Sequence, residues 1–220
     1  MKYTRHITAP MANKDLIDSD NTELDAKAQT KYRSAVGTLQ YYATKTMRCL
    51  AHPVARLAQY NSRPAVGAWQ QLEQVIARLA QHSYMPLSGP VCKQTVWDVY
   101  SDSDHSGDRQ LGLRSHTGVV ILCNGVPVQW RSKKQPTTAI SSTAAEIYAL
   151  AEAVKDAQLN SWRAEELGYT RELPIQVQVD NAAGIVFQKK MNPNSNLKGM
   201  IQLRDAWVKE LQDLSIGKTL

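Results

Sequence analysis

The sequence predicts an α/β domain built on a mixed β-sheet and preceded by a small helical segment. Residues 31–87 carry apolar side chains at helical spacing, and the character of the chain changes around Ser88-Gly89-Pro90. Beyond this point the predicted elements are three strands, a helix, a strand and two helices. A right-handed helical crossover would lay the fourth strand parallel to, and beside, the first strand of a three-stranded antiparallel meander.

Composition and charge narrow the class of protein. The 220 residues, 43% hydrophobic and 21% charged, suffice for one ordinary domain and an accessory segment. A net charge of +6 gives a weak preference for polyanionic partners. The three cysteines lie far apart, which argues against a disulfide framework and a zinc knuckle. Without an apolar N-terminal run or a membrane span, we expect a cytoplasmic or nuclear protein that is not secreted and has no membrane partner.

The N-terminal part of the chain predicts a flexible segment followed by three helices. Residues 1–30 are polar and mixed in charge, and we expect them to be flexible. Residues 31–90 are expected to form a helical connection segment. Its first helix runs from Tyr32 to Thr44, and a short helix follows Pro53, a residue tolerated at helix starts. The apolar stripe of the third helix comprises Trp69, Leu72, Val75, Ile76 and Leu79.

Residues 91–220 are expected to form the α/β domain. Alternating, β-rich sequence predicts strands over residues 95–101, 117–123 and 126–131. Asn124-Gly125 is a strong sequence signal for a two-residue hairpin turn, because both residues tolerate positive φ angles.

A long crossover helix is expected from about Ser142 to Leu167. Ser142 or Thr143 would cap its start, and Gly168 would close its end. The remaining expected elements are a strand over residues 173–179 and helices over residues 181–189 and 197–214.

Three carboxylates fall at places where this topology would bring them together. Asp102 ends the first strand, Asp180 ends the fourth, and Glu146 lies in the first turns of the crossover helix. The carboxyl ends of neighbouring parallel strands share one crevice, so these acids would repel one another unless cations neutralise them. Two Mg²⁺ ions, roughly 4 Å apart, would suit phosphodiester cleavage at such a site. Taken singly, an acid at a strand end is more often a solvated turn residue.

Several ordered motifs resemble those of one family. Residues 100–108 (YSDSDHSGD) resemble the signature YSDSDWAGD, with His105 in place of Trp, and residues 132–137 (SKKQPT) match a further motif. Residues 140–150 (ISSTAAEIYAL) are similar to LSTTEAEYMAL, and residues 179–185 (VDNAAGI) to CDNQSAI. Upstream, the segment YRSAVGTLQY resembles YRSAVGSLMYL. These are motifs of the ribonuclease H domain, with its preceding reverse transcriptase connection, of copia-type LTR retrotransposon Pol polyproteins.

The resemblance, which covers about residues 31–214, implies a ribonuclease H-like fold and a nuclease activity. It makes Asp102, Glu146 and Asp180 the first three members of an acidic quartet that holds two Mg²⁺ ions, with Mn²⁺ as a substitute. The implied partners are an RNA–DNA hybrid, whose RNA strand is cut, and the reverse transcriptase region of the same polyprotein. Lys133 and Lys134 are candidate phosphate contacts, and Asn181 is a candidate to orient Asp180 or to cap the next helix.

One departure from the family pattern leaves two hypotheses open. The fourth acid of the family follows a fifth strand, but this chain ends at residues 215–220, where that strand would be starting. We therefore expect the domain to lack its last strand and helix. The chain is then either an active Mg²⁺-dependent nuclease or a truncated or domesticated inactive remnant that keeps the fold and at most binds nucleic acid. A third alternative, another nuclease or transposase on the same fold, is disfavoured by the upstream helical segment.

Overall fold

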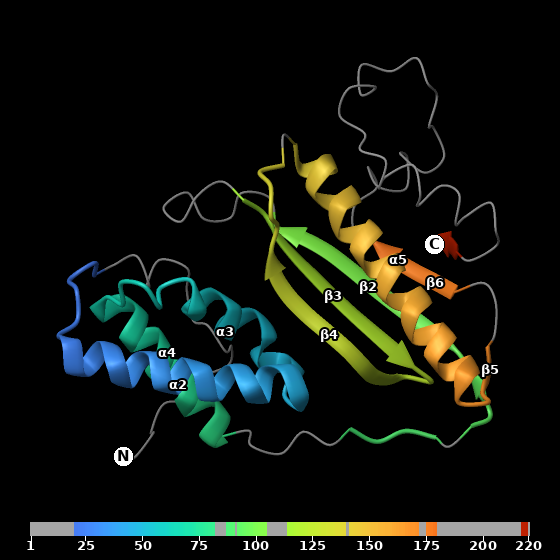
Figure 1. The fold of residues 1–220 in the computed structure, drawn as a ribbon, viewed down its shortest axis with the longest axis horizontal. Helices are drawn as coiled ribbons and strands as arrows, with labels where there is room; N and C mark the ends of the chain where they lie inside the picture. The colour runs from blue at the N-terminus through green and yellow to red at the C-terminus, as the bar shows by residue number, and fades with distance from the viewer. Residues whose placement is uncertain are drawn as a thin grey trace. The chain divides into compact units, whose positions relative to one another are not determined.

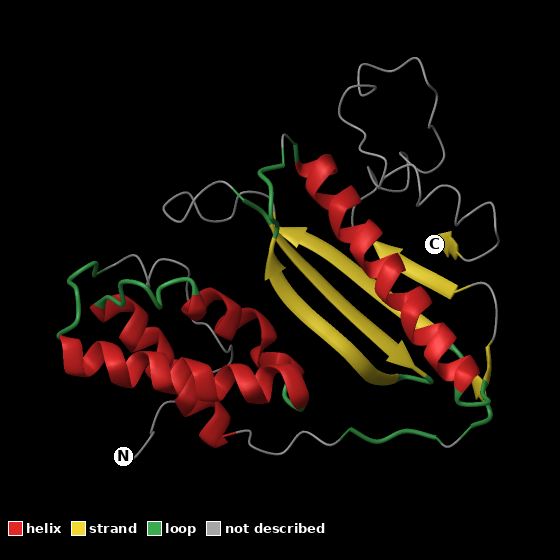
Figure 2. Cartoon of the chain, viewed as in Figure 1, coloured by secondary structure: helices red, strands yellow, loops and turns green. Residues whose placement is uncertain are grey.

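A computed structural model of the protein describes residues 20–81, 87–90, 92–104, 114–139, 141–171, 175–179 and 217–219. The chain divides into two compact units, Met1–Pro86 and Leu87–Leu220. In the part of the chain that the structure describes, the first unit consists of helices, and the second contains the main sheet with one long helix (Figures 1 and 2). We call them the helical unit and the sheet unit.

Helix α2 (Ala26–Lys45) confirms the first predicted helix but begins before the expected start at Tyr32. The reason is a cap that the apolar pattern does not reveal: the side chain of Asp25 accepts a hydrogen bond from the Ala28 amide at 2.6 Å. The helix buries one stripe, and the hydroxyl of buried Tyr32 donates to the Leu57 carbonyl at 2.8 Å. This stripe consists of Tyr32, Val36, Leu39 and Ala43.

The other two predicted helices of this unit are also confirmed. A 3-10 turn (Arg48–Leu50) leads into α3 (Ala51–Ala58), and α4 spans Val66–Gln81. Both helices bury apolar side chains, with Val54 and Leu57 of α3 and Leu72 and Val75 of α4 at most 2% exposed. Among the described helices of the chain, none has the length and apolarity needed to cross a membrane.

The main sheet has five strands in the order β4-β3-β2-β6-β7. β2 pairs antiparallel with β3, β3 pairs antiparallel with β4, and β6 runs parallel to β2, which confirms the predicted mixed sheet. Asn124 and Gly125 have φ angles of 50° and 77°, as the predicted hairpin turn requires. The strands are β2 (Trp97–Asp104), β3 (His116–Cys123), β4 (Val126–Lys134), β6 (Ile175–Val179) and β7 (Gly217–Thr219).

Two features of the strands differ from the prediction. The expectation that the last strand is missing needs correction, because β7 pairs in parallel with β6 from Ile175↔Gly217 onward. Its three residues lack the length that makes a strand visible in a sequence pattern. In addition, the short strands β1 (Gln94–Thr95) and β5 (Thr170–Arg171) form a separate parallel pair that the sequence pattern does not predict.

Helix α5 (Ser142–Glu166) is the predicted crossover helix. The predicted cap at Ser142 or Thr143 is wrong by one position or more, because the hydroxyl of Ser141 accepts from the Ala144 amide at 3.1 Å. Gly168, with a φ angle of 85°, follows the last turn as expected. The helices predicted over residues 181–189 and 197–214 lie outside the described residues.

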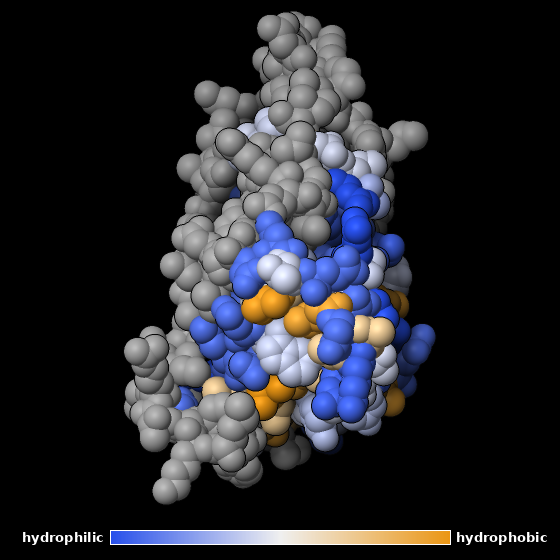
Figure 3. Space-filling view, turned by 90° about the vertical axis from the view of Figure 1, so that its left-hand side faces the viewer, coloured by the Kyte–Doolittle hydropathy of each residue, from blue (hydrophilic) through white to orange (hydrophobic). Residues whose placement is uncertain are grey.

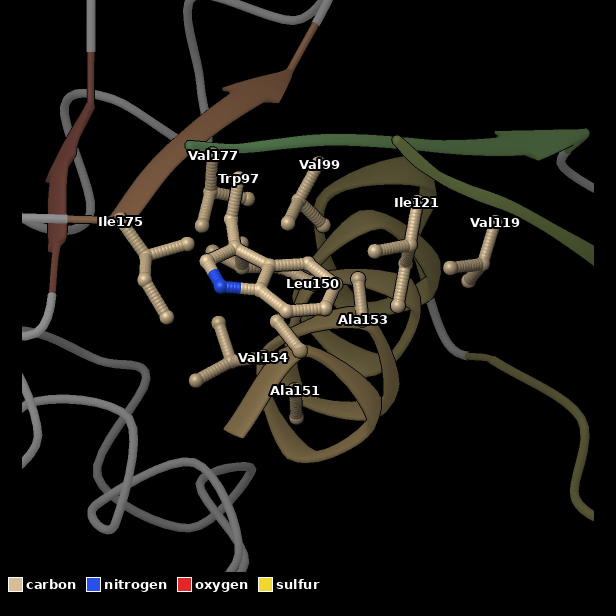
Figure 4. Close-up of a cluster of buried hydrophobic side chains, with 11 residues drawn as sticks. Trp97, Val99, Val119, Ile121, Leu150, Ala151, Ala153, Val154, Ile175 and Val177 are labelled. Carbon is tan, nitrogen blue, oxygen red and sulfur yellow. The ribbon is translucent and has the colours of Figure 1, made fainter. Parts of the chain in front are cut away.

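One face of the sheet packs on α5 and forms the core of the sheet unit. Side chains of β2, β3 and β6 meet Leu150, Ala153 and Val154 of the helix (Figure 4). Trp97, Val99, Ser101 and Ser103 are buried, whereas the intervening Tyr100, Asp102 and Asp104 are exposed. Because side chains alternate along a strand, Asp102 belongs to the face that points away from α5. The strand residues in this core are Trp97, Val99, Val119, Ile121, Ile175 and Val177.

A polar cluster also connects β4 to α5. The Arg131 guanidinium (Nη2) lies 3.1 Å from Oε2 of Glu152 and 2.8 Å from Oδ2 of Asp156. The Asn160 amide donates to Gln129 at 2.6 Å in the same cluster. Burial raises the pKa of the Asp156 carboxyl, Arg131 opposes the rise, and Glu152 adds to it. One cation therefore serves two carboxylates that are largely removed from water.

Replacing Asp156 by asparagine should make unfolding less pH-dependent. Since the folded pKa is raised, the folded chain binds this proton more tightly than the unfolded chain, whose carboxyl titrates at about 4. The contribution of Asp156 to stability therefore falls as pH rises through its folded pKa. We therefore expect the stability of Asp156→Asn relative to wild type, measured as the difference in free energy of unfolding, to be higher at pH 7 than at pH 4. Urea unfolding at both pH values tests this, with Asn160→Ala as a non-titrating control; an equal difference at both would contradict it.

Candidate active site at the end of the sheet

Asp102 lies near the carboxyl end of β2 with an exposed side chain. Its Oδ1 accepts a hydrogen bond from the Ser103 amide at 2.7 Å. Its cross-strand neighbour in β3 is Gly118, and the nearest atom to a Cβ built there would be the Asp102 carbonyl oxygen, 3.9 Å away. Because Gly118 has no side chain, the position beside the carboxylate is left open for a ligand.

Glu146 lies in the first turns of α5 and is 8% exposed. The start of this helix lies at the end of the sheet where β2 ends (Figure 1). Gln135, which follows β4, fixes this arrangement, because its side-chain amide donates both to the Thr117 hydroxyl and to the Ala145 carbonyl, at 3.0 Å each. The structure thus brings the elements that carry Asp102 and Glu146 to one end of the sheet. Gln135 lies inside the SKKQPT motif, but the sequence does not indicate that its side chain connects the sheet to α5.

The third predicted acid, Asp180, lies outside the described residues, as does Asn181. The strand that precedes it is described, however, and Ser101 of β2 pairs with Val179 of β6 in a parallel register. Within the described residues, no three His, Cys, Asp or Glu side chains gather into a group that could hold a metal ion.

The two lysines predicted to contact nucleic acid lie at this end of the sheet but on opposite faces. Lys133 pairs with Thr117, whose other neighbour is Ser103, so Lys133 belongs to the face covered by α5. Lys134 pairs with His116, opposite Asp104, and belongs to the same face as Asp102. Only Lys134 therefore shares a face with the exposed acid.

The interior beside Asp102 is polar as well as buried. The hydroxyls of Ser101 and Ser103 are both buried, and neither has a hydrogen-bond partner among the residues that the structure describes. They flank Asp102 in the chain and belong to the face that packs on α5. Buried hydroxyls of this kind normally form hydrogen bonds with water or a polar ligand. This end of the sheet is therefore more polar than the rest of the core.

A second candidate surface lies on α2, in the helical unit. The spacing of its exposed residues places six of them along one line, on the side opposite the buried stripe. We call this line the α2 ridge; it extends over about 27 Å of helix. α2 contains no acidic residue, and the described surface viewed in Figure 3 is mainly hydrophilic with small hydrophobic patches. The α2 ridge consists of Lys27, Lys31, Ser34, Thr38, Tyr41 and Lys45.

Two features make the α2 ridge suited to a polyanion. Tyr41 is 63% exposed, and the three lysines are exposed without an acid on the same helix to neutralise them. Gly37 lies beside Ser34 and Tyr41, and a Cβ built there would have no atom within 4 Å. A nucleic acid backbone could thus approach the helix closely while the lysines contact its phosphates.

Comparison with known proteins finds similar proteins, although no family model matches the chain. It is 27% identical over 222 aligned positions, 97% of its length, to the retrovirus-related Pol polyprotein from transposon TNT 1-94 of Nicotiana tabacum. It is 32% identical over 171 residues, 74% of its length, to the Pol polyprotein from transposon RE2 of Arabidopsis thaliana. The chain is homologous to Pol polyproteins of copia-type transposons over most of its length.

The chain spans only a small part of these polyproteins, namely 16% of the TNT 1-94 protein and 11% of the RE2 protein. It is also similar to a shorter protein, the secreted RxLR effector protein 161 of Plasmopara viticola. The identity there is 39% over 126 residues, which cover 57% of this chain and 88% of that protein.

Comparison with solved structures finds two similar folds. The foamy viral protease–reverse transcriptase dRH, solved in complex with double-stranded DNA, matches 96% of this chain and 35% of its own, with a TM-score of 0.50 and 12% identity. LC11-RNase H1, isolated from compost, matches 57% of this chain and 82% of its own, with a TM-score of 0.41 and 16% identity. At this level of identity the foamy viral structure supports the fold alone.

Proposed function

We propose that the chain is a divalent-metal-dependent nuclease domain that cuts the RNA strand of RNA–DNA hybrids. The parallel pairing of β2 with β6 carries the proposal. Asp102 directly follows Ser101, and Asp180 directly follows Val179, the residue paired with Ser101. Because successive Cα atoms are only about 3.8 Å apart, we expect Asp180 to follow β6 at a position next to Asp102 of β2. The similarity of the chain to Pol polyproteins of copia-type transposons supports this function.

The residues present fit a hard divalent cation. Carboxylate oxygens are the donors that Mg²⁺ and Mn²⁺ prefer, and the missing side chain at Gly118 leaves room beside Asp102. Asp102, Glu146 and Asp180 would hold the metal, which when bound supplies Lewis acidity and lowers the pKa of water to give a nucleophile. The protein itself would fix the positions of the carboxylates, exclude water on the α5 side and, through Lys134, attract the phosphate backbone.

Hydrolysis of a labelled hybrid by the full chain tests the proposal. With Mg²⁺ or Mn²⁺ we expect cleavage of the RNA strand, and with excess chelator we expect none, because the phosphate and the water would both lack activation. Cleavage that persists in chelator would contradict metal dependence. Binding without any cleavage would favour the alternative of a domain that keeps the fold and at most binds nucleic acid.

The α2 ridge yields a separate expectation about the same substrate. Replacing Lys27, Lys31 and Lys45 by glutamine should weaken hybrid binding and flatten its dependence on salt. For each lysine–phosphate pair that is removed, the slope of log K against log salt should fall by about one unit, because fewer counterions are released. Lys155→Gln, an exposed lysine of α5 outside the ridge, is the control. Equal slopes for wild type and the triple variant, measured by fluorescence anisotropy, would rule the ridge out as a phosphate-binding surface.

A further inference from the structure

Gln135 is a polar residue that the structure buries almost completely, with 2% of it exposed. It follows the last residue of β4, and its main-chain amide donates to the Ser115 carbonyl at 2.7 Å. Its side-chain nitrogen donates both to the Thr117 hydroxyl of β3 and to the Ala145 carbonyl of α5, at 3.0 Å each. Burying an amide is unfavourable unless its hydrogen bonds are made, so this environment selects glutamine for its two side-chain donors.

Each acceptor lies close in the fold to one of the proposed metal ligands, Ala145 to Glu146 and Thr117 to Asp102. The Ala145 carbonyl belongs to the peptide group that joins Ala145 to Glu146. Thr117 is the cross-strand partner of Ser103, the residue that follows Asp102 in β2. One side-chain amide therefore ties the end of the β2–β3 pair to the peptide that carries Glu146. The Ser141 cap, which accepts from the Ala144 amide, fixes the same turn of α5 from its other side.

We propose that Gln135 is a positioning residue that holds Glu146 in register with Asp102 for metal binding. This inference rests on the function proposed above. The two hydrogen bonds join the first turns of α5 to β3 through a single buried side chain. Small displacements of a ligand weaken a metal site, and the loss of an outer hydrogen bond to a ligand typically lowers metal affinity about 10–100-fold.

The chain supplies a matched control for this residue. Gln129 also lies on β4 and also connects to α5, because its side chain accepts from the Asn160 amide at 2.6 Å. This contact is about 22 Å along the helix from Ala145, far from Glu146. Gln129→Met and Gln135→Met each remove polar contacts between β4 or the residue after it and α5 while nearly keeping the side-chain volume. A merely structural role for Gln135 predicts that the two variants behave alike.

Two measurements on the full chain test the inference. In hydrogen exchange, Gln135→Met should speed the exchange of the amides of Glu146 to Ala149, whereas Gln129→Met should affect amides near Asn160. Unchanged exchange at Glu146 to Ala149 in Gln135→Met would refute the inference, whether or not the chain is a nuclease. In Mn²⁺ titrations by calorimetry, Gln135→Met should raise the Kd about tenfold or more, and Gln129→Met should leave it unchanged.

The calorimetry separates failure of this inference from failure of the proposed function. If Asp102→Asn weakens Mn²⁺ binding but Gln135→Met does not, the metal site stands and the positioning role of Gln135 is refuted. If wild type and Asp102→Asn bind Mn²⁺ equally, the proposed metal site is refuted, and the role of Gln135 in metal binding falls with it. A Kd raised only in Gln135→Met and Asp102→Asn supports both.

Discussion

Asp102→Asn is expected to reduce cleavage of an RNA–DNA hybrid by more than about a hundredfold, because loss of an outer partner of a metal ligand already costs about 10–100-fold. Asparagine keeps the shape of the side chain and can still accept the hydrogen bond from the Ser103 amide, found here at 2.7 Å. The fold and hybrid binding should therefore persist, and the loss should lie in the chemical step. Rates measured at saturating hybrid and Mg²⁺ would test the expectation.

Asp104→Asn is the matched control for this experiment. Asp104 lies two residues further along β2, is exposed, and belongs to the same face as Asp102. It lacks the neighbouring glycine, since its partner in β3 is His116. We expect its substitution to change the rate by less than about threefold. Equal losses for both variants would indicate a general effect of negative charge on this face, and an active Asp102→Asn would remove Asp102 from the metal site.

Ile121→Ala is expected to lower the free energy of unfolding of the sheet unit by about 3 kcal/mol, within the roughly 2–5 kcal/mol found for such truncations. Ile121 of β3 is 0% exposed, and its side chain lies between the sheet and α5 in the cluster that includes Val99 and Leu150 (Figure 4). The strand pairs on both sides of β3 limit how far the core can collapse around the cavity. Hydrogen exchange of the amides of β2 and β3 would measure the loss.

Leu122→Ala provides the comparison on the same strand. Leu122 is the next residue, belongs to the opposite face and is only partly buried. We expect its truncation to cost about 1 kcal/mol or less, because solvent already reaches the side chain. A loss at Leu122 as large as that at Ile121 would show that the face away from α5 is also a packed core.

The site was predictable in part, and its gaps have identifiable causes. The sequence predicted that Asp102 lies near the end of a strand and Glu146 in the first turns of the crossover helix, and the structure has both placements, whereas their part in a metal site stays a prediction. Gln135 was missed because a polar residue after a strand ordinarily faces solvent, and no local pattern marks it as buried. The two lysines were grouped together because they are adjacent in sequence, yet adjacent strand residues point to opposite faces.

The sequence by itself determined the helices of the first unit, the three-stranded meander, its Asn124-Gly125 turn and the parallel fourth strand. These follow from hydrophobic periodicity and turn chemistry, which act over a few residues. Only the tertiary structure decided which face of the sheet α5 covers, that β7 pairs with β6, and that Gln135 joins the sheet to the helix. These depend on contacts between segments far apart in the chain, whose free energy appears only when the elements pack.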